Sequence, residues 1–174
     1  MPVFSIFILA FVFLFSFFGL SIYSVDAYTL NSNAILASPS YEHYLGTDRL
    51  GRDILARLMQ GGQVSLIIGV GSAFIASFIG LLLGSIAGYL RGNVDKTFIV
   101  VVDLFLTFPT FFLLLALVSY VNASAWVLIV IISITGWMTT ARLIRSESFK
   151  ITSQPYIKIL NIAKLSKLKI LFKY

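Results

Sequence analysis

Five charged side chains stand close together in the otherwise apolar first half of the chain: Asp48, Arg49, Arg52, Asp53 and Arg57. Asp48–Arg52 and Asp53–Arg57 are each spaced four residues apart with the acid first, the order that favours ion pairing on a helix. Apolar residues at helical spacing follow, and glycines flank the stretch. The spacing predicts a turn and then a short amphipathic helix at a membrane surface. The chemistry of this stretch would be ion pairing rather than catalysis.

Residue patterns typical of catalysis or metal binding are absent from the sequence. It contains no nucleotide-binding loop, no serine or acid pair arranged for nucleophilic or general acid–base work, and no cluster of metal ligands. His43 is the only histidine and lies in a polar loop, where we expect solvation rather than metal binding. With no cysteine, disulfides and thiolate metal sites are excluded. We therefore expect no enzyme activity, no catalytic residue, no metal and no cofactor.

The composition indicates a protein of the lipid bilayer. Of 174 residues, 59% are hydrophobic and 11% are charged, and the mean hydropathy is +0.96. A soluble domain has about a quarter of its residues charged. The net charge of +6 would suggest a nucleic-acid partner for a soluble protein, but eight of the thirteen Lys and Arg residues lie between positions 142 and 174. We expect a lipid bilayer, and no nucleic acid, as the partner of these charges.

Four apolar stretches are long enough to cross a hydrocarbon core of about 30 Å: residues 1–23, 64–89, 98–121 and 125–144. The predicted fold class is all-α, a polytopic membrane protein with four transmembrane helices. The first stretch has no positive n-region and no small-residue cleavage site, so a membrane helix is favoured over a cleaved signal peptide. An external loop with the amphipathic helix would occupy residues 24–63.

Small residues recur every four positions through the second predicted span: Ser72, Ala76, Gly80, Gly84 and Gly88. Glycine is frequent in membrane helices in general. Five small residues in register nevertheless indicate a face that lets another helix approach the backbone closely. We therefore expect a helix-packing face here.

The third predicted span is irregular. Pro109 must interrupt its helical hydrogen bonds, because proline has no N–H. Asp103 lies one turn inside the span. An acid within a membrane span is costly, so its presence suggests a functional role. Arg91 and Lys96 are close enough in sequence for Asp103 to be an interfacial residue instead. A role at a helix end and a role in a transport path both remain open for Asp103.

The last segment, residues 148–174, interleaves apolar side chains with five lysines after Pro155. This pattern is typical of a basic amphipathic helix, or of two short ones, on an anionic leaflet or against a partner. Residues 91–96 and the chain from Arg142 onward carry ten Lys and Arg residues, against three in residues 24–63. The positive-inside rule then predicts that both termini are cytoplasmic and that the 24–63 loop is external.

Four motifs, in order along the chain, carry a resemblance to a known family: LGTDRLGRDILARLMQGGQVSL, IAGYLRGNVDK, VVDLFLTFPTFFLLLALV and GWMTTARLIRSE. Over residues 44–147 the chain resembles the permease subunit of binding-protein-dependent ATP-binding-cassette importers for dipeptides, oligopeptides and nickel chelates. The external motif would comprise Gly46, Thr47, Asp48, Leu50, Gly51, Arg52 and Asp53. The resemblance implies a multi-pass protein of the bacterial cytoplasmic membrane, with residues 64–174 forming part of a type I importer permease domain.

The resemblance also implies partners, namely a second permease subunit in a heterodimer, two cytoplasmic ATPase subunits and an external substrate-binding protein. Members of the family carry a Glu-Ala-Ala loop, with a later glycine, that seats in a groove of the ATPase. The matching coupling region here would be Tyr156, Ile157, Lys158, Ile159, Leu160, Lys164 and Ser166. Lys158, Ile159 and Leu160 replace the Glu-Ala-Ala, and Lys164 replaces the glycine.

Two functions follow from these observations. The first is a permease subunit that moves peptides or nickel chelates. The second is a non-transporting remnant or membrane assembly protein, because members of the family continue into two further spans and this sequence would be C-terminally shortened. An ion-coupled carrier is less consistent with the sequence, since carriers usually contain internal repeats and none is visible.

Overall fold

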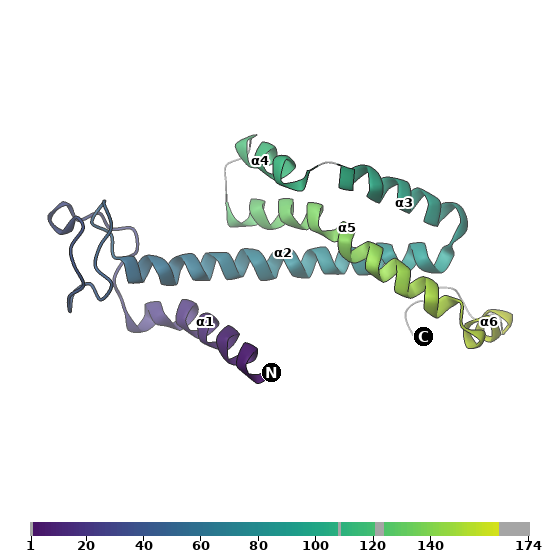
Figure 1. Cartoon of the computed structure of the whole chain (residues 1–174), viewed down its shortest axis with the longest axis horizontal. Helices are drawn as coiled ribbons and strands as arrows, with labels where there is room; N and C mark the ends of the chain where they lie inside the picture. Colours follow the sequence, from purple (N-terminus) through teal and green to yellow (C-terminus); the bar gives the residue numbers. More distant parts are fainter. Residues whose placement is uncertain (1, 108, 121–123, 164–174) are drawn as a thin grey trace. The chain divides into compact units, whose positions relative to one another are not determined.

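The computed structural model describes residues 2–107, 109–120 and 124–163 of the chain. These residues form helices and loops, with an isolated β-bridge between Thr47 and Asp53 and no strand in the described part. The helices are α1 (Pro2–Ile22), α2 (Ile54–Leu90), α3 (Gly92–Thr107), α4 (Thr110–Tyr120), α5 (Ala125–Thr152) and α6 (Pro155–Ile162), with a 3₁₀ turn at Ser32–Ala34 (Figure 1). The all-α fold class is confirmed.

Three of the described helices are long and apolar enough to cross a membrane: α1 over Val3–Ile22, α2 and α5. Large apolar side chains of α1, such as Phe4 and Phe7, are exposed, as expected for a helix whose solvent is lipid. The span predicted at 98–121 is two shorter helices, because Pro109 lies between α3 and α4 and cannot continue the hydrogen bonds of α3. The structure therefore supports a polytopic membrane fold with three candidate spans among the described helices, and the predicted count of four is not confirmed.

Several predicted boundaries differ from the observed ones. The amphipathic helix predicted before residue 63 and the span predicted at 64–89 form one continuous helix, α2, of 37 residues. The polar turn predicted at 91–96 is much shorter, because α3 already begins at Gly92. Arg91 and Gly92 turn the chain with positive φ angles of 55° and 60°. The helix predicted to end near residue 144 continues to Thr152.

The chain divides into two compact units, residues 1–68 and residues 69–174. The first contains α1, the loop that follows it and the start of α2. In the second, α3, α4 and α6 each contact α5. Buried residues of α5 such as Ile129, Met138 and Ala141 form much of its core. The second unit is therefore assembled around α5.

Candidate functional site

The charged motif of the first unit is an ordered loop that leads into α2, and Asp48 lies at its centre. The Asp48 carboxylate accepts hydrogen bonds from the backbone N–H groups of Leu50 (2.8 Å) and Arg52 (3.0 Å). The guanidinium groups of Arg52 and Arg57 both pair with it, Arg52 Nη2 at 2.8 Å. Partial burial favours the neutral acid, but these hydrogen bonds and the Arg52 charge outweigh it and hold the pKa of Asp48 below its usual value.

Asp53 is 2% exposed and caps the N-terminus of α2. Its Oδ1 accepts a hydrogen bond from the N–H of Ala56 at 2.8 Å, which satisfies one of the free donors of the first helical turn. Its Oδ2 accepts a hydrogen bond from the Tyr23 hydroxyl at 2.7 Å and lies 2.8 Å from Nδ1 of His43. We call Tyr23, His43 and Asp53 the Asp53 cluster.

The contacts of the Asp53 cluster shift the pKa values of Asp53 and Tyr23. Burial acts to raise the pKa of Asp53, but the hydrogen bonds from Ala56, Tyr23 and His43 outweigh it, so this pKa is lowered. Burial, together with the hydrogen bond to a carboxylate, raises the pKa of Tyr23 to about 12. At neutral pH the cluster therefore holds an ionised carboxylate and a neutral phenol.

Two predictions for this loop are wrong. Arg57 pairs with Asp48 and not with Asp53, because Asp53 precedes the first helical turn and directs its carboxylate to the helix N-terminus. His43, predicted to be solvated, has a side chain 20% exposed and pairs with Asp53. The Asp48–Arg52 pair is present, but it crosses a turn rather than a helical surface. Within the described residues, no group of three potential metal ligands comes together.

Two glycines of the motif adopt left-handed backbone conformations, with φ of 72° at Gly46 and 73° at Gly51. A Cβ atom at Gly51 would lie 1.9 Å from the carbonyl oxygen of Asn31, and one at Gly46 would lie 2.4 Å from that of Ala37. Thr47 is buried between them, and its Oγ1 accepts a hydrogen bond from the N–H of Ala37 at 2.8 Å. The motif thus packs directly on the backbone of the preceding loop.

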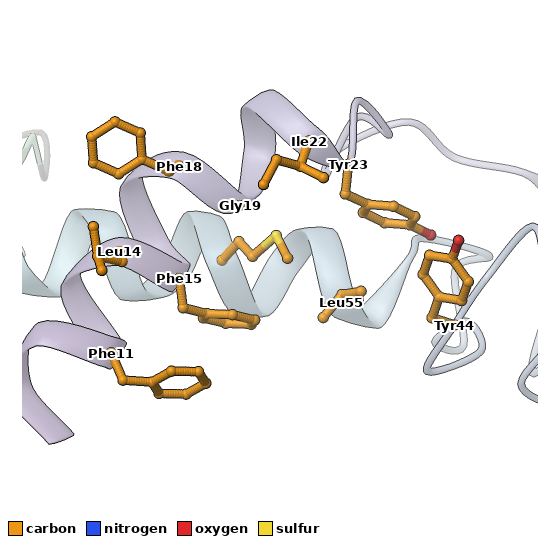
Figure 2. Close-up of a pocket in the computed structure, with 10 residues that line it drawn as sticks. Phe11, Leu14, Phe15, Phe18, Gly19, Ile22, Tyr23, Tyr44 and Leu55 are labelled. Atoms are coloured by element: carbon orange, nitrogen blue, oxygen red, sulfur yellow. The ribbon is translucent and has the colours of Figure 1, made fainter. Parts of the chain in front are cut away.

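An apolar pocket of about 480 Å³ lies beside this loop, between α1 and the start of α2 (Figure 2). Tyr23 and Tyr44 lie at its loop end, with ring centroids 5.3 Å apart. The remaining lining is almost wholly apolar: Phe11, Leu14, Phe15, Phe18, Gly19, Ile22, Leu55 and Met59. These side chains make the pocket suited to an apolar group.

In the second unit, the glycines of the small-residue stripe lie against the backbone of α5. A Cβ atom at Gly84 would lie 2.4 Å from the carbonyl oxygen of Ala141. One at Gly88 would lie 2.7 Å from that of Arg145, and Gly80 is similarly close to α5. Because the blocking atoms belong to the backbone, a side chain at these positions would push the helices apart.

The other two members of the stripe, Ser72 and Ala76, are buried. The hydroxyl of Ser133 on α5 lies 3.3 Å from the carbonyl oxygen of Ser72. A Cβ atom built at Gly136 would lie 3.6 Å from that of Ala76, an ordinary contact. All five residues of the stripe thus lie along the face of α2 that meets α5.

Asp103 on α3 pairs with Arg142 on α5, with Oδ1 and Nη2 2.5 Å apart, and both side chains are largely exposed. A second, less exposed ion pair joins the same helices nearer the start of α3. There, the Asp95 carboxylate accepts a hydrogen bond from Nη2 of Arg145 at 2.6 Å and also contacts Nε of the same guanidinium. The acid of the predicted third span therefore takes part in a contact between α3 and α5.

Arg91 makes a contact that sequence reasoning missed. Its Nη2 lies 3.0 Å from the carbonyl oxygen of Phe149, 2.9 Å from Oγ1 of Thr152 and 2.7 Å from Oγ of Ser153. Its Cζ lies 4.0 Å from the centroid of the Phe149 ring. We call these four residues the Arg91 latch. Its partners are about sixty positions away in the sequence, so no local pattern indicates them.

The predicted coupling region falls on α6 and on the residues beyond it. Tyr156, Ile157, Lys158, Ile159 and Leu160 are part of α6, whereas Lys164 and Ser166 lie outside the described residues. Ile157 is 2% exposed, and α6 contacts α5. Tyr156 and Ile159 are exposed. One side of α6 is thus anchored in the protein while the other remains accessible.

Comparison with known proteins gives a consistent set of similarities. Residues 80–174 match the model of a family described as binding-protein-dependent transport system inner membrane component. The oligopeptide transport system permease protein OppC of Mycobacterium tuberculosis (strain ATCC 25618 / H37Rv) is 34% identical over 151 residues, covering 86% of this chain and 51% of that protein.

Two proteins of Bacillus subtilis (strain 168) are similar to the chain as well. The oligopeptide transport system permease protein OppC is 31% identical over 136 residues, covering 78% of this chain and 45% of that protein. The dipeptide transport system permease protein DppC is 32% identical over 155 residues, covering 88% of this chain and 48% of that protein. The chain spans about half the length of the curated relatives it matches.

Proposed function

The chain belongs to the family of binding-protein-dependent transport system inner membrane components, and we propose that it is a permease subunit of an ATP-binding-cassette importer for peptides. The observation that carries the proposal is the similarity to oligopeptide and dipeptide permeases, which extends over 78–88% of this chain. The family is one of transport components rather than enzymes.

The membrane arrangement that we propose has four crossings and a permease domain over residues 64–174. In it, α3 and α4 cross the bilayer together as one broken span, in addition to α1, α2 and α5. The start of α1 and the α6 segment then lie in the cytoplasm, and the loop between α1 and α2 is external. The excess of Lys and Arg at residues 91–96 and from Arg142 onward, compared with the external loop, supports this orientation.

The partners that we propose follow the same division. Cytoplasmic ATPase subunits would contact α6 through its exposed side, where Tyr156 and Ile159 supply apolar surface. An external substrate-binding protein would dock on the loop of the first unit, where Arg49 and Leu50 are exposed beside the Asp48 ion pairs. A second permease subunit would complete the pathway in the membrane.

Reconstitution tests this function directly. The chain is co-purified with candidate partner permease and ATPase subunits, placed in lipid vesicles and supplied with a binding protein and labelled peptide. We expect peptide uptake that requires ATP and the binding protein, with a nickel chelate taken up poorly. Vesicles without the binding protein serve as the control. Failure of the chain to form any complex with the ATPase and permease subunits would contradict the proposal.

A further inference from the structure

The Arg91 latch joins the end of α2 to the last turn of α5. The final carbonyl groups of a helix have no intrahelical partner, and a cation near them is stabilising. Nη2 of Arg91, which carries two N–H donors, lies within hydrogen-bond distance of one such carbonyl, that of Phe149, and of the hydroxyls of Thr152 and Ser153, so it can donate to two of these three oxygens at once. The two hydroxyls in turn donate to the Phe149 carbonyl. The stacking of Arg91 on the Phe149 ring adds a cation–π contact. One side chain thus holds this turn of α5 by several interactions.

The backbone of Arg91 indicates that this position is constrained. Its φ of 55° lies in the left-handed region, which a residue with a side chain rarely adopts. Such a conformation persists only where the surrounding contacts determine it. A glycine would fit this backbone more easily, and the next residue is Gly92, with a φ of 60°. The contacts of the latch account for an arginine at this position.

The last turn of α5, which the Arg91 latch contacts, leads directly into α6. Ser153 is the C-cap of α5, and Pro155 begins α6. Ser153 Oγ, besides binding Arg91, lies 2.8 Å from the carbonyl oxygen of Phe149. The buried Ile157 fixes the first turn of α6 in the protein. The direction of α6 therefore depends on the short connection between α5 and α6, residues 153–154, which we call the elbow. The Arg91 latch joins the α5 end of this elbow to the end of α2.

The start of α3 is tied to the same end of α5. Asp95 on α3 pairs with Arg145, and the hydroxyl of Ser148 donates a hydrogen bond to the carbonyl oxygen of Ser85 on α2 at 3.2 Å. A displacement of the elbow would therefore act on the α2–α3 turn through the latch and through these neighbouring contacts.

We propose that Arg91 is a positioning residue that sets the direction of α6 and transmits its movement to the α2–α3 turn. The transmission part rests on the proposed function, in which α6 receives the movement of the ATPase. The positioning part depends only on the contacts of this chain. The two parts are tested by separate measurements.

Three variants isolate the latch. Arg91→Gly removes the side chain but keeps the left-handed backbone favourable, so the turn itself is preserved. Arg91→Lys keeps the charge but loses the planar group that stacks on the Phe149 ring. Lys150→Gln is the control, because Lys150 lies in the same last turn of α5 and pairs with the exposed Glu147 instead of the latch.

The positioning part is measured as a distance. Spin labels are attached at Val94 on α3 and Ile159 on α6, both exposed, in the full chain in lipid nanodiscs. We expect a single narrow distance distribution in the parent protein and in Lys150→Gln. Arg91→Gly and Arg91→Lys should broaden it. An unchanged distribution in both Arg91 variants overturns the proposal.

The transmission part is measured in the assembled importer as peptide transported per ATP hydrolysed. We expect Arg91→Gly to retain ATP hydrolysis while this ratio falls below that of the parent importer. A role in capping α5 alone would lower the amount of folded protein but leave the ratio unchanged. A broadened distance distribution with a parental ratio therefore overturns transmission. If the parent importer moves no peptide, the proposed function fails and the distance measurement still decides positioning.

Discussion

Asp53 joins three separate parts of the first unit through one buried carboxylate. Tyr23 comes from the end of α1, His43 from the middle of the loop, and Ala56 from the first turn of α2. A buried charge is costly unless it is paired and hydrogen-bonded, and here both oxygens accept hydrogen bonds. The same carboxylate therefore starts the helix and closes the loop over its start.

Replacing the Asp53 carboxylate by an amide tests this role. In Asp53→Asn we expect the free energy of unfolding to fall by roughly 1–3 kcal/mol at neutral pH, the usual cost of unsatisfied buried donors. The pKa of Asp53 is lowered in the folded state, so its stabilisation is full above the unfolded value of about 4 and is lost as the pH falls through the folded value. Thermal unfolding in detergent, followed from neutral to acidic pH, measures both effects.

The control for this experiment is Asp26→Asn. Asp26 is exposed and, among the residues that the structure describes, accepts hydrogen bonds from nearby residues of its own turn, Tyr28 and Thr29. The same change of charge should leave the unfolding temperature almost unaltered. Equal losses in the two variants would show that charge, and not the Asp53 cluster, determines the stability of the loop.

Gly51 and Gly61 form a second matched pair at the residue scale. In Gly51→Ala the new Cβ would overlap the carbonyl oxygen of Asn31, and the left-handed backbone alone costs about 1–2 kcal/mol with a side chain. In Gly61→Ala, within α2, the Cβ meets nothing within 4 Å, and helix propensity favours alanine by about 1 kcal/mol. Limited proteolysis of the loop should therefore accelerate in Gly51→Ala and not in Gly61→Ala. Equal cleavage rates would contradict the packing that we describe.

At the scale of elements, the contact between α2 and α5 depends on the absence of side chains. Inside a bilayer, helices associate through close packing, because lipid tails are as apolar as the side chains they would replace. In Gly84→Ala, the methyl group would lie 2.4 Å from a backbone oxygen of α5, and no rotamer change can relieve this overlap. Both helices would have to move apart.

We expect Gly84→Ala to lower the free energy of unfolding in nanodiscs by about 1–3 kcal/mol, the usual cost of overpacking. Gly69→Ala is the control in the same helix, because a Cβ at Gly69 meets nothing within 4 Å. A similar unfolding temperature for Gly84→Ala and the parent protein would rule out a close α2–α5 contact.

Prolines and the lengths of apolar runs predicted several helices correctly, because both affect the conformation of neighbouring residues directly. Pro109 marks the interruption between α3 and α4, Pro155 begins α6, and the first apolar run is α1. Two helix ends without such residues, those predicted at residues 63 and 144, were misplaced. No proline or helix-capping pattern marks residue 63 or residue 144, and α2 and α5 continue through these positions.

The pairing of side chains was less predictable than the elements. The Asp53–Arg57 prediction assumed a helix at Asp53, whereas the helix begins one residue later and Arg57 turns to Asp48. The partners of His43 and Arg91 were not foreseen, because they lie ten and about sixty positions away. A sequence with charges at regular spacing indicates which groups can pair, but tertiary structure decides which ones do.

At the scale of the whole molecule, the proposed orientation predicts which residues can be labelled from outside the cell. Tyr41 in the loop and Ile159 on α6 are both exposed in the structure. The chain has no cysteine of its own, so single cysteines at these positions report cleanly. A membrane-impermeant maleimide should label Tyr41→Cys in intact cells and Ile159→Cys only after the membrane is opened. The opposite pattern would reverse the proposed topology.

The interruption between α3 and α4 has a consequence for hydration. In an unbroken helix, the carbonyl of Phe105 would accept a hydrogen bond from the N–H of residue 109, but Pro109 has none. Lipid tails cannot supply a donor, and an unsatisfied carbonyl in hydrocarbon costs several kcal/mol. If α3 and α4 cross the bilayer together, water molecules or a polar neighbour have to reach this junction. In that arrangement the junction is a place where the membrane interior has to hold a hydrogen-bond donor, either water or a neighbouring polar group.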